Sequence, residues 1–260
     1  MRSAAVVLLV ALVLTPRAAA DPPRAGITHV HVPPGTSQVE YGKQLFGANC
    51  VTCHGPDGRG IFTPVQGAGD QKGLGPSLQG VGALAPDFYL RTGYMPLDDP
   101  NKQPHRDHVL FSEQEIRALV AYVASLGPGP AIPAPHPERG NLAAGLQLFT
   151  EHCAGCHQVV TEGGYVTGAV APPLGNATAV QVAEAVRIGP YLMPRFSAKQ
   201  ISDRQLDSII RYVRYAKHPD DRGGWSIGHV GPVPEGLVTW FIGIGLVVAT
   251  CIVIGRRIES

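Results

Sequence analysis

The sequence predicts an all-α protein with two similar helical domains in tandem and one membrane-spanning helix near the C-terminus. Three observations support this. A Cys-x-x-Cys-His pentad occurs twice, as Cys50–His54 and Cys153–His157. Each pentad follows an amphipathic stretch, and each half closes with another that has apolar residues at helical spacing. Finally, Leu237–Ile254 is a run of 18 residues without a charge.

The two pentads have the pattern for covalent attachment of a c-type haem. Two thiols three positions apart can reach one porphyrin edge and form thioethers, and the histidine that follows is then placed under the ring, where it can bind iron. The pattern therefore predicts two covalently bound haem c groups and an electron carrier. The predicted attachment and ligand residues are Cys50, Cys53 and His54 in the first half, and Cys153, Cys156 and His157 in the second.

Three other roles for the cysteine pairs fit the sequence less well. Zinc sites built from two such pairs have a far shorter spacing between them. A thioredoxin-like dithiol has a βαβ context, which surrounds neither pair. A disulfide between residues three apart closes too small a loop to constrain the unfolded chain much. None of these roles explains the histidine after each second cysteine.

The composition suits two small domains better than one large core. The 260 residues include 32 Gly and 24 Pro, which indicates many loops. Lys and Arg total 21 and Asp and Glu total 20, so the chain is nearly neutral. Near-neutrality gives no indication of nucleic-acid binding, and it favours a docked partner over long-range steering of a soluble one.

The N-terminus has the features of a secretory signal peptide over residues 1–20. Arg2 precedes a short apolar run that ends in an Ala-x-Ala site, so that cleavage leaves Asp21 as the first residue. The alternative is an uncleaved anchor, against which the short run argues. Residues 21–38 are rich in proline and are expected to form an extended segment.

The first domain is predicted over residues 39–127. A helix over residues 39–50 delivers the first cysteine. The closing helix begins at the capping box Ser112–Glu115 and has apolar residues at i, i+3, i+4 and i+7. Its end is set by Gly127 in a Gly-Pro-Gly-Pro run, after which residues 128–137 form a proline-rich linker.

The second domain, predicted over residues 138–222, repeats this order. Helices are expected over residues 141–153 and Thr178–Ile188, and the closing helix follows the cap Ser202–Gln205. Gln-Leu-Phe lies at the same distance before both pentads, and Tyr122 corresponds to Tyr212. The chain is therefore a duplication of one haem-binding unit of roughly 85 residues.

The methionines supply one further candidate ligand for each half. Besides the initiator, the chain has only Met95 and Met193, and each is followed by proline. A thioether sulfur opposite an imidazole is the ligation of soluble cytochromes c, so both are predicted as iron ligands. Core packing is the other common use of methionine, but it does not explain the matched positions. The alternative ligands beside Met95 are His105 and His108.

The C-terminal run predicts a transmembrane helix over residues 236–255, between a juxtamembrane segment (223–235) and a tail (256–260). Arg256 and Arg257 follow the span directly. By the positive-inside rule, the tail is cytoplasmic and both haem domains lie on the extracytoplasmic side.

Taken together, these features resemble the dihaem cytochrome c subunit of the actinobacterial cytochrome bc complex, a menaquinol–cytochrome c reductase. The resemblance covers nearly the whole chain. It is carried by Gly-Pro-Ser-Leu-Gln-Gly-Val-Gly at 75–82, by Asp-Phe leading to Thr-Gly-Tyr-Met-Pro over 87–96, and by Gly-Pro before Met-Pro over 189–194. The sequence departs from the expected pattern at Tyr94, where a basic residue is expected.

The resemblance implies two class-I cytochrome c domains in which a proline carbonyl orients each axial histidine. Carried over, Pro76 orients His54 and Pro172 orients His157, because such an acceptor fixes the tautomer and the ring plane. The implied partners are a cytochrome b subunit, a Rieske iron–sulfur subunit and a haem–copper oxidase held in one supercomplex. Electrons are then expected to pass from the Rieske protein through the first and second haem to the oxidase, at a bacterial cell membrane.

The predicted function is therefore that of the electron-transfer subunit of a quinol–cytochrome c reductase, a translocase, without an active site of its own. One alternative is the dihaem cytochrome subunit of another membrane dehydrogenase or oxidase. The other is a dihaem peroxidase, which needs one iron open to peroxide. The paired methionines and the C-terminal anchor favour the relay.

Overall fold

The computed structural model describes residues 26–61, 75–97, 103–219 and 232–258. The predicted signal peptide lies outside these ranges, as do most of the juxtamembrane segment and the last two residues of the predicted tail. The chain divides into two units between Arg214 and Tyr215, so that both pentads belong to the first unit and the C-terminal helix to the second.

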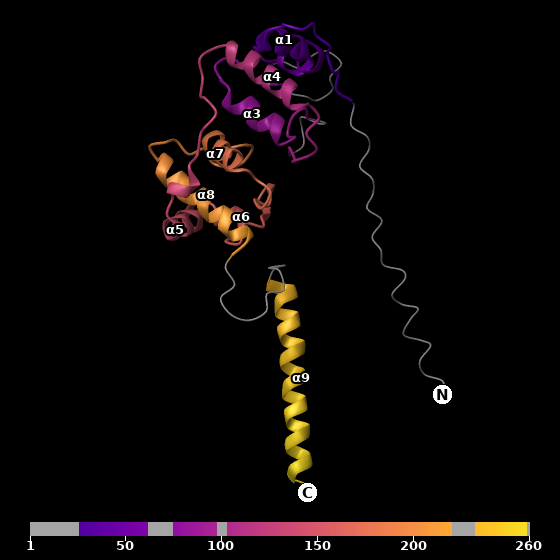
Figure 1. Ribbon diagram of the computed structural model, residues 1–260, viewed down its shortest axis with the longest axis vertical. Coiled ribbons are helices and arrows are strands. Elements are labelled where there is room, and N and C mark those ends of the chain that lie inside the picture. The colour runs from indigo at the N-terminus through magenta and orange to yellow at the C-terminus, as the bar shows by residue number, and fades with distance from the viewer. Residues whose placement is uncertain (1–25, 62–74, 98–102, 220–231, 259–260) are drawn as a thin grey trace, which may run out of the picture. The chain divides into compact units, whose positions relative to one another are not determined.

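The described part of the first repeat contains four helices. They are α1 (Gln38–Asn49), α2 (Val51–His54), α3 (Leu84–Arg91) and α4 (Glu113–Ser125), of which Figure 1 labels α1, α3 and α4. The capping box predicted at Ser112 and Glu115 is present at the start of α4. Helices α1 and α4 pack against each other and bury the core of this repeat, formed mainly by Leu45, Phe46, Ile116, Leu119 and Val123.

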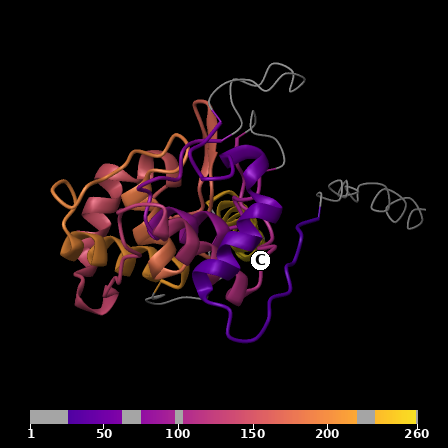
Figure 2. The same cartoon turned by 90° about the horizontal axis from the view of Figure 1, so that it is seen from above.

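The second repeat, drawn in pink to orange in Figure 2, follows the same order of elements. It contains a short 3-10 helix η1 (Pro137–Arg139), then α5 (Leu142–His152), α6 (Ala154–His157), α7 (Ala179–Ile188) and α8 (Asp203–Lys217). The predicted caps are present: the Thr178 hydroxyl accepts from the Gln181 N–H at 3.1 Å, and the Ser202 N–H donates to the Gln205 side chain at 2.8 Å. The two helical domains in tandem are confirmed.

A glycine lets the two long helices of each repeat cross closely. A Cβ at Gly42 of α1 would lie 1.9 Å from the Ala118 carbonyl oxygen of α4. At the matched position in α5, a Cβ at Gly145 would lie 2.0 Å from the Ser208 carbonyl oxygen of α8. Only a residue without a side chain allows backbones this close.

The aromatic pair beside each crossing also repeats. The rings of Phe46 and Tyr122 lie 5.1 Å apart with an interplanar angle of 53°, and those of Phe149 and Tyr212 lie 5.3 Å apart at 52°. Such tilted contacts are favourable for aromatic rings and add to the burial of their apolar area. The correspondence seen in the sequence therefore extends to the packing of the two cores.

The described part of the chain also has two short strands, which the all-α prediction did not include. β1 (Gly164–Val166) and β2 (Ala169–Ala171) form an antiparallel hairpin. Its turn contains Gly168, whose φ of +79° suits a tight two-residue connection. The strands are too short to show the period-two pattern that would have identified them in the sequence.

The described part of the N-terminal segment and the linker both form hydrogen bonds to the helical domains. Asn49 exchanges two hydrogen bonds with the backbone of Thr28, at 2.7 and 2.9 Å. In the linker, the Pro130 carbonyl accepts from the N–H groups of Ala83 and Leu84, and the His136 N–H donates to Asp207 at 2.6 Å. The predicted linker therefore packs against both domains.

The second unit contains α9 (Pro232–Ile258), which includes the predicted span. Its apolar stretch, Glu235–Arg257, has a mean hydropathy of 2.6 and none of it is buried, so it is long and apolar enough to cross a membrane. The hydroxyls of Thr239 and Thr250 donate to carbonyls one turn earlier, which leaves no unpaired hydroxyl hydrogen on either. The helix continues through Arg256 and Arg257, residues that the sequence placed in the tail.

Candidate haem sites

Both pentads lie at the same kind of break between two helices. α1 ends before Cys50 and α5 ends before Cys153, and these two cysteines have nearly equal backbone angles (φ −119°, ψ −24° and φ −122°, ψ −36°). In each case the histidine N–H then donates to the carbonyl of the first cysteine at 2.9 Å. One tight turn therefore holds both thiols and the imidazole of each pentad together.

The loop after each pentad returns to it by a matched hydrogen bond. The Gly60 N–H donates to the His54 carbonyl at 2.8 Å, and the Gly163 N–H donates to the His157 carbonyl at 3.0 Å. The residue after the histidine has positive φ in both repeats, +74° at Gly55 but +58° at Gln158. The second repeat therefore holds a side chain in the left-handed conformation where the first has glycine.

Each predicted iron ligand among the histidines is oriented by a proline carbonyl. His54 Nδ1 lies 2.9 Å from the Pro76 carbonyl oxygen, and His157 Nδ1 lies 3.1 Å from that of Pro172. A carbonyl only accepts hydrogen bonds, so Nδ1 carries the proton and donates it, and Nε2 keeps a free lone pair. This is the tautomer that a metal-binding imidazole needs.

Burial favours a protonated thiol at the first cysteine of each pentad and a neutral imidazole at His157. Burial, together with the neighbouring Cys53, raises the pKa of the Cys50 thiol to about 12. Burial next to Cys156 raises the pKa of Cys153 to about 11. Burial lowers the pKa of His157, although its hydrogen bond to Pro172 acts in the opposite direction.

The structure brings the second set of predicted site residues together on one cavity. Cys153, Cys156, His157, Pro172 and Met193 all line it. The remaining walls of the second repeat are largely apolar, with side chains from α5, α7 and α8 such as Phe149, Val182, Val186, Ile209 and Val213. An apolar cleft with an imidazole, a thioether and two thiols on its surface fits a covalently attached porphyrin.

The first set is placed in two parts. Cys50, Cys53, His54 and Pro76 lie around α2 and the loop that follows it. Met95 comes shortly after α3, where its N–H donates to the Tyr89 carbonyl at 3.1 Å. Its role as the ligand opposite His54 stays a prediction.

One wall of the cavity in the second domain is formed by residues of the first domain. The sequence analysis did not predict this wall. Phe88, Tyr89 and Tyr94 line the cavity together with Gln103 and Arg106. The three rings contact one another, with Phe88 stacked on Tyr94 at 5.8 Å and Tyr89 in edge contact with Phe88 at 5.3 Å. The unexpected tyrosine before Met95 was the only sequence signal for this wall.

The cysteines show neither a disulfide nor a zinc site. All five are free, and the four pentad cysteines keep their thiols available for attachment. Within the described ranges, no group of three or more His, Cys, Asp or Glu side chains is placed to hold a metal ion. The donor sets that are present, one imidazole with two thiols on a single turn, fit haem c.

Comparison with protein families gives matches over both domains. A family model described as "Cytochrome c" matches residues 39–127. A second model, described as "Cytochrome C oxidase, cbb3-type, subunit III", matches residues 140–213. These matches agree with the two helical domains described above.

Curated relatives are similar over most of the chain. The cytochrome bc1 complex cytochrome c subunit of Corynebacterium diphtheriae is 35% identical over 237 residues, which cover 84% of this chain and 81% of the relative. The subunit of the same name from Mycobacterium leprae is 38% identical over 226 residues, covering 83% and 74%. A cbb3-type cytochrome c oxidase subunit CcoP from Azospirillum sp. is 30% identical over 194 residues, covering 66% and 60%.

Proposed function

The chain belongs to the family of cytochrome c subunits of actinobacterial cytochrome bc1 complexes, and on this premise we propose that it holds two haem c groups and relays electrons between membrane partners. Membership of this family implies covalently bound haem c. It also implies electron transfer within a bc complex, in association with the other subunits of that complex. The number of haems, their ligands and the route of the electrons are what we propose.

The proposed first haem is attached through Cys50 and Cys53, and the second through Cys153 and Cys156. When bound, each haem supplies an iron that takes up and gives back one electron. His54 and His157 are the proposed ligands on one side of the iron, with their Nδ1 protons held by Pro76 and Pro172. Met95 and Met193 are the proposed ligands on the other side, where a thioether raises the potential.

The observation that carries this proposal is the repetition of one geometry. Two pentads, one in each repeat, form the same turn, and in both the imidazole donates to a proline carbonyl, at 2.9 and 3.1 Å. In the second site the proposed ligands His157 and Met193 share one cavity. Irons that bound both proposed ligands would have no open position, and this would favour electron relay over a peroxidase, which needs an open iron.

A count of covalent haem tests the number of sites. The full chain should carry two haems that resist denaturing extraction, and replacing Cys153 and Cys156 with serine should halve that number. Replacing Cys251, which lies in α9, with serine serves as the control and should leave the count at two. A wild-type chain with fewer than two covalent haems contradicts the proposal.

The proposed partners are a cytochrome b subunit and a Rieske iron–sulfur subunit on the donor side and a haem–copper oxidase on the acceptor side. Support comes from the family, from the apolar helix α9 and from the near-zero net charge, which suits a docked partner. Purification in mild detergent should recover a b-type cytochrome and a Rieske protein with this chain. Recovery of a dehydrogenase instead would favour the alternative cytochrome subunit.

The proposed orientation places both haem domains on the extracytoplasmic side and the C-terminus in the cytoplasm. Its support is the Arg256-Arg257 pair at the end of α9, which the positive-inside rule assigns to the cytoplasm. Protease added to intact spheroplasts should therefore digest the haem domains and leave a C-terminal fragment. Haem domains that are cut only after lysis would reverse the orientation.

A further inference from the structure

The first domain contributes one wall of the cavity in the second domain, and two side chains of that wall hold the second domain directly. Gln103 pairs with the backbone of Val170 in β2: its Nε2 donates to the Val170 carbonyl and its Oε1 accepts from the Val170 N–H, each at 2.9 Å. The Gln103 side chain therefore extends the edge of the hairpin as another strand would.

The second connection is made by Arg106. Its Nη2 donates to the Gln181 Oε1 of α7 at 3.2 Å. Gln181 is buried, and its Nε2 donates in turn to the Arg91 carbonyl at the end of α3. Its Oε1 also accepts from the Thr178 N–H. The Gln181 side chain that completes the capping box of α7 therefore also accepts from Arg106. Arg106 is thereby held at the cavity by the second domain.

Arg106 is the one charged residue among the first-domain residues that line the described cavity; the others are the three aromatic residues with Thr92, Gln103 and Pro104. Burial raises the pKa of the Tyr94 phenol, and the charge of Arg106 acts in the opposite direction. A guanidinium keeps its positive charge at every physiological pH. A fixed positive charge beside a redox group favours its electron-rich, reduced form. Arg106 is exposed, so solvent weakens this effect but leaves its direction unchanged.

We propose that the second haem site is built from both domains, with Gln103 fixing the wall and Arg106 raising the electron affinity of the group bound at Cys153 and Cys156. The inference rests on the proposed function, since it needs a haem at that position. Both residues belong to the first domain: Gln103 acts by positioning the wall, and Arg106 acts through its charge. The group bound at Cys153 and Cys156 would then lie where the two domains meet.

The test for Arg106 is a redox titration of the full haem-loaded chain in mild detergent. Arg106→Gln should lower the potential of the second haem, and Arg106→Lys, which keeps the charge, should restore most of it. Arg204→Gln is the matched control, because Arg204 is an exposed arginine of the second domain that does not line the cavity. Equal potentials in wild type and Arg106→Gln would overturn the assignment.

The haem affected is identified with the chain in which Cys153 and Cys156 are serine. That chain keeps only the first haem, so Arg106→Gln should leave its potential unchanged. A shift that persists there would place Arg106 at the first site and overturn the inference. The covalent haem count is made on the same samples. A count below two in wild type rejects the proposed function itself, whereas a count of two without a shift rejects only the role of Arg106.

Gln103 has a readout that does not involve the haem. Gln103→Ala removes the acceptor for the Val170 N–H, so amide hydrogen exchange in residues 164–171 should become at least severalfold faster. Gln147→Ala, which removes an exposed glutamine of α5 paired only with Glu151 in its own helix, should leave that exchange unchanged. Unchanged exchange in Gln103→Ala would show that the wall is held without it.

Discussion

Asp87 in α3 and Glu184 in α7 are both buried where these two helices, one from each haem domain, pack against each other, and their carboxyl groups interact. Glu184 is fully buried, and neither of its oxygens receives a hydrogen bond from an N–H or hydroxyl group of the described residues. A hydrogen bond between two carboxyls needs a proton on one of them. Burial first, and then the charge of Asp87, raise the pKa of Glu184 to about 8.

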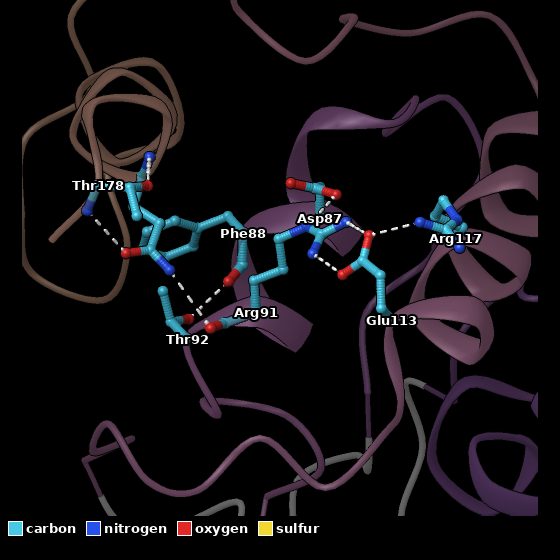
Figure 3. Close-up of polar contacts among 8 residues, drawn as sticks. Asp87, Phe88, Arg91, Thr92, Glu113, Arg117 and Thr178 are labelled. Atoms are coloured by element: carbon cyan, nitrogen blue, oxygen red, sulfur yellow. Dashed lines mark hydrogen bonds and ion pairs between the residues drawn. The ribbon is translucent and has the colours of Figure 1, made fainter.

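Asp87 itself is bound to a charge network on the first domain. Arg91 Nε donates to Asp87 at 2.8 Å, and the same guanidinium donates to Glu113 of α4, which also accepts from Arg117 at 3.1 Å (Figure 3). Asp87 therefore already accepts from a guanidinium, whereas Glu184 has no such donor and is the member of the pair that holds the proton. The positive charge of Arg91 lowers the pKa of Glu184, but burial and Asp87 outweigh it, so the pKa stays raised.

This pair makes the stability of the domain pair dependent on pH. The pKa of Glu184 is raised from an ordinary value of 4.5 to about 8 on folding, so the contribution of its proton is complete below 4.5 and is lost as the pH rises through about 8. The free energy of unfolding should fall by on the order of 1–3 kcal/mol across this window. Thermal unfolding of the full chain at about pH 5 and about pH 9 measures it.

Glu184→Gln should remove most of that dependence, because an amide supplies a donor to Asp87 at every pH. Glu162→Gln, at an exposed glutamate of the same domain, is the control and should keep the wild-type profile. A Glu184→Gln variant with an unchanged profile would mean that another group causes the dependence.

The helix crossings give a prediction about packing. Gly42→Ala should lower the free energy of unfolding by on the order of 2 kcal/mol or more, since its Cβ meets a backbone carbonyl that cannot rotate away. Gly47→Ala in the same helix has open space around the new Cβ and should stabilise by about 0.5–1 kcal/mol through helix propensity. Denaturant unfolding compares the two, and equal effects would contradict the crossing.

The methionines give a prediction about the irons. Met95→Ala and Met193→Ala should each lower the potential of one haem and open its iron to carbon monoxide, because each methionine is a proposed iron ligand and a thioether ligand raises the potential. Redox titration and carbon monoxide difference spectra measure both effects. Each variant is the control for the other, since each should leave one haem unchanged. A methionine variant in which both haems keep their potentials and bind no carbon monoxide would show that this methionine is not an iron ligand.

The left-handed residue after the second pentad gives a prediction about strain. Gln158 has φ +58°, whereas the matched Gly55 has φ +74°. Gln158→Gly should stabilise the chain by about 1 kcal/mol, because glycine adopts this conformation without the steric cost. Glu162→Gly, in the same loop but without positive φ in the structure, should not stabilise. Chemical denaturation distinguishes them, and a loss of stability in Gln158→Gly would show that its side chain is needed.

Local signals in the sequence predicted the features that depend on local chemistry. The capping residues Ser112 and Thr178 and the charge-free run of α9 were identified because their patterns span one or a few turns of helix. The hairpin at 164–171 was not predicted, because strands of three residues are too short to show an alternating pattern. The helix α9 extends beyond the predicted span at both ends, because hydropathy marks the apolar stretch and not the ends of the helix.

The contacts between the domains could not be predicted in this way. Gln103 and Val170 are 67 residues apart, and Asp87 and Glu184 come from different repeats. Glutamine in a loop and glutamate on a helix are both typical of solvated surfaces, so nothing local distinguishes these from exposed residues. Only the packing of one repeat on the other shows what they do.

The shared wall has a consequence for how the duplication can evolve. Two copies of a unit that each enclosed their own cofactor could drift apart, lose a copy or be exchanged between proteins as modules. Here the buried Gln181 side chain of one half is paired with Arg106 and with the Arg91 carbonyl of the other. Substitutions at such positions are expected to be epistatic across the repeat boundary, so selection acts on the two halves as one inherited piece.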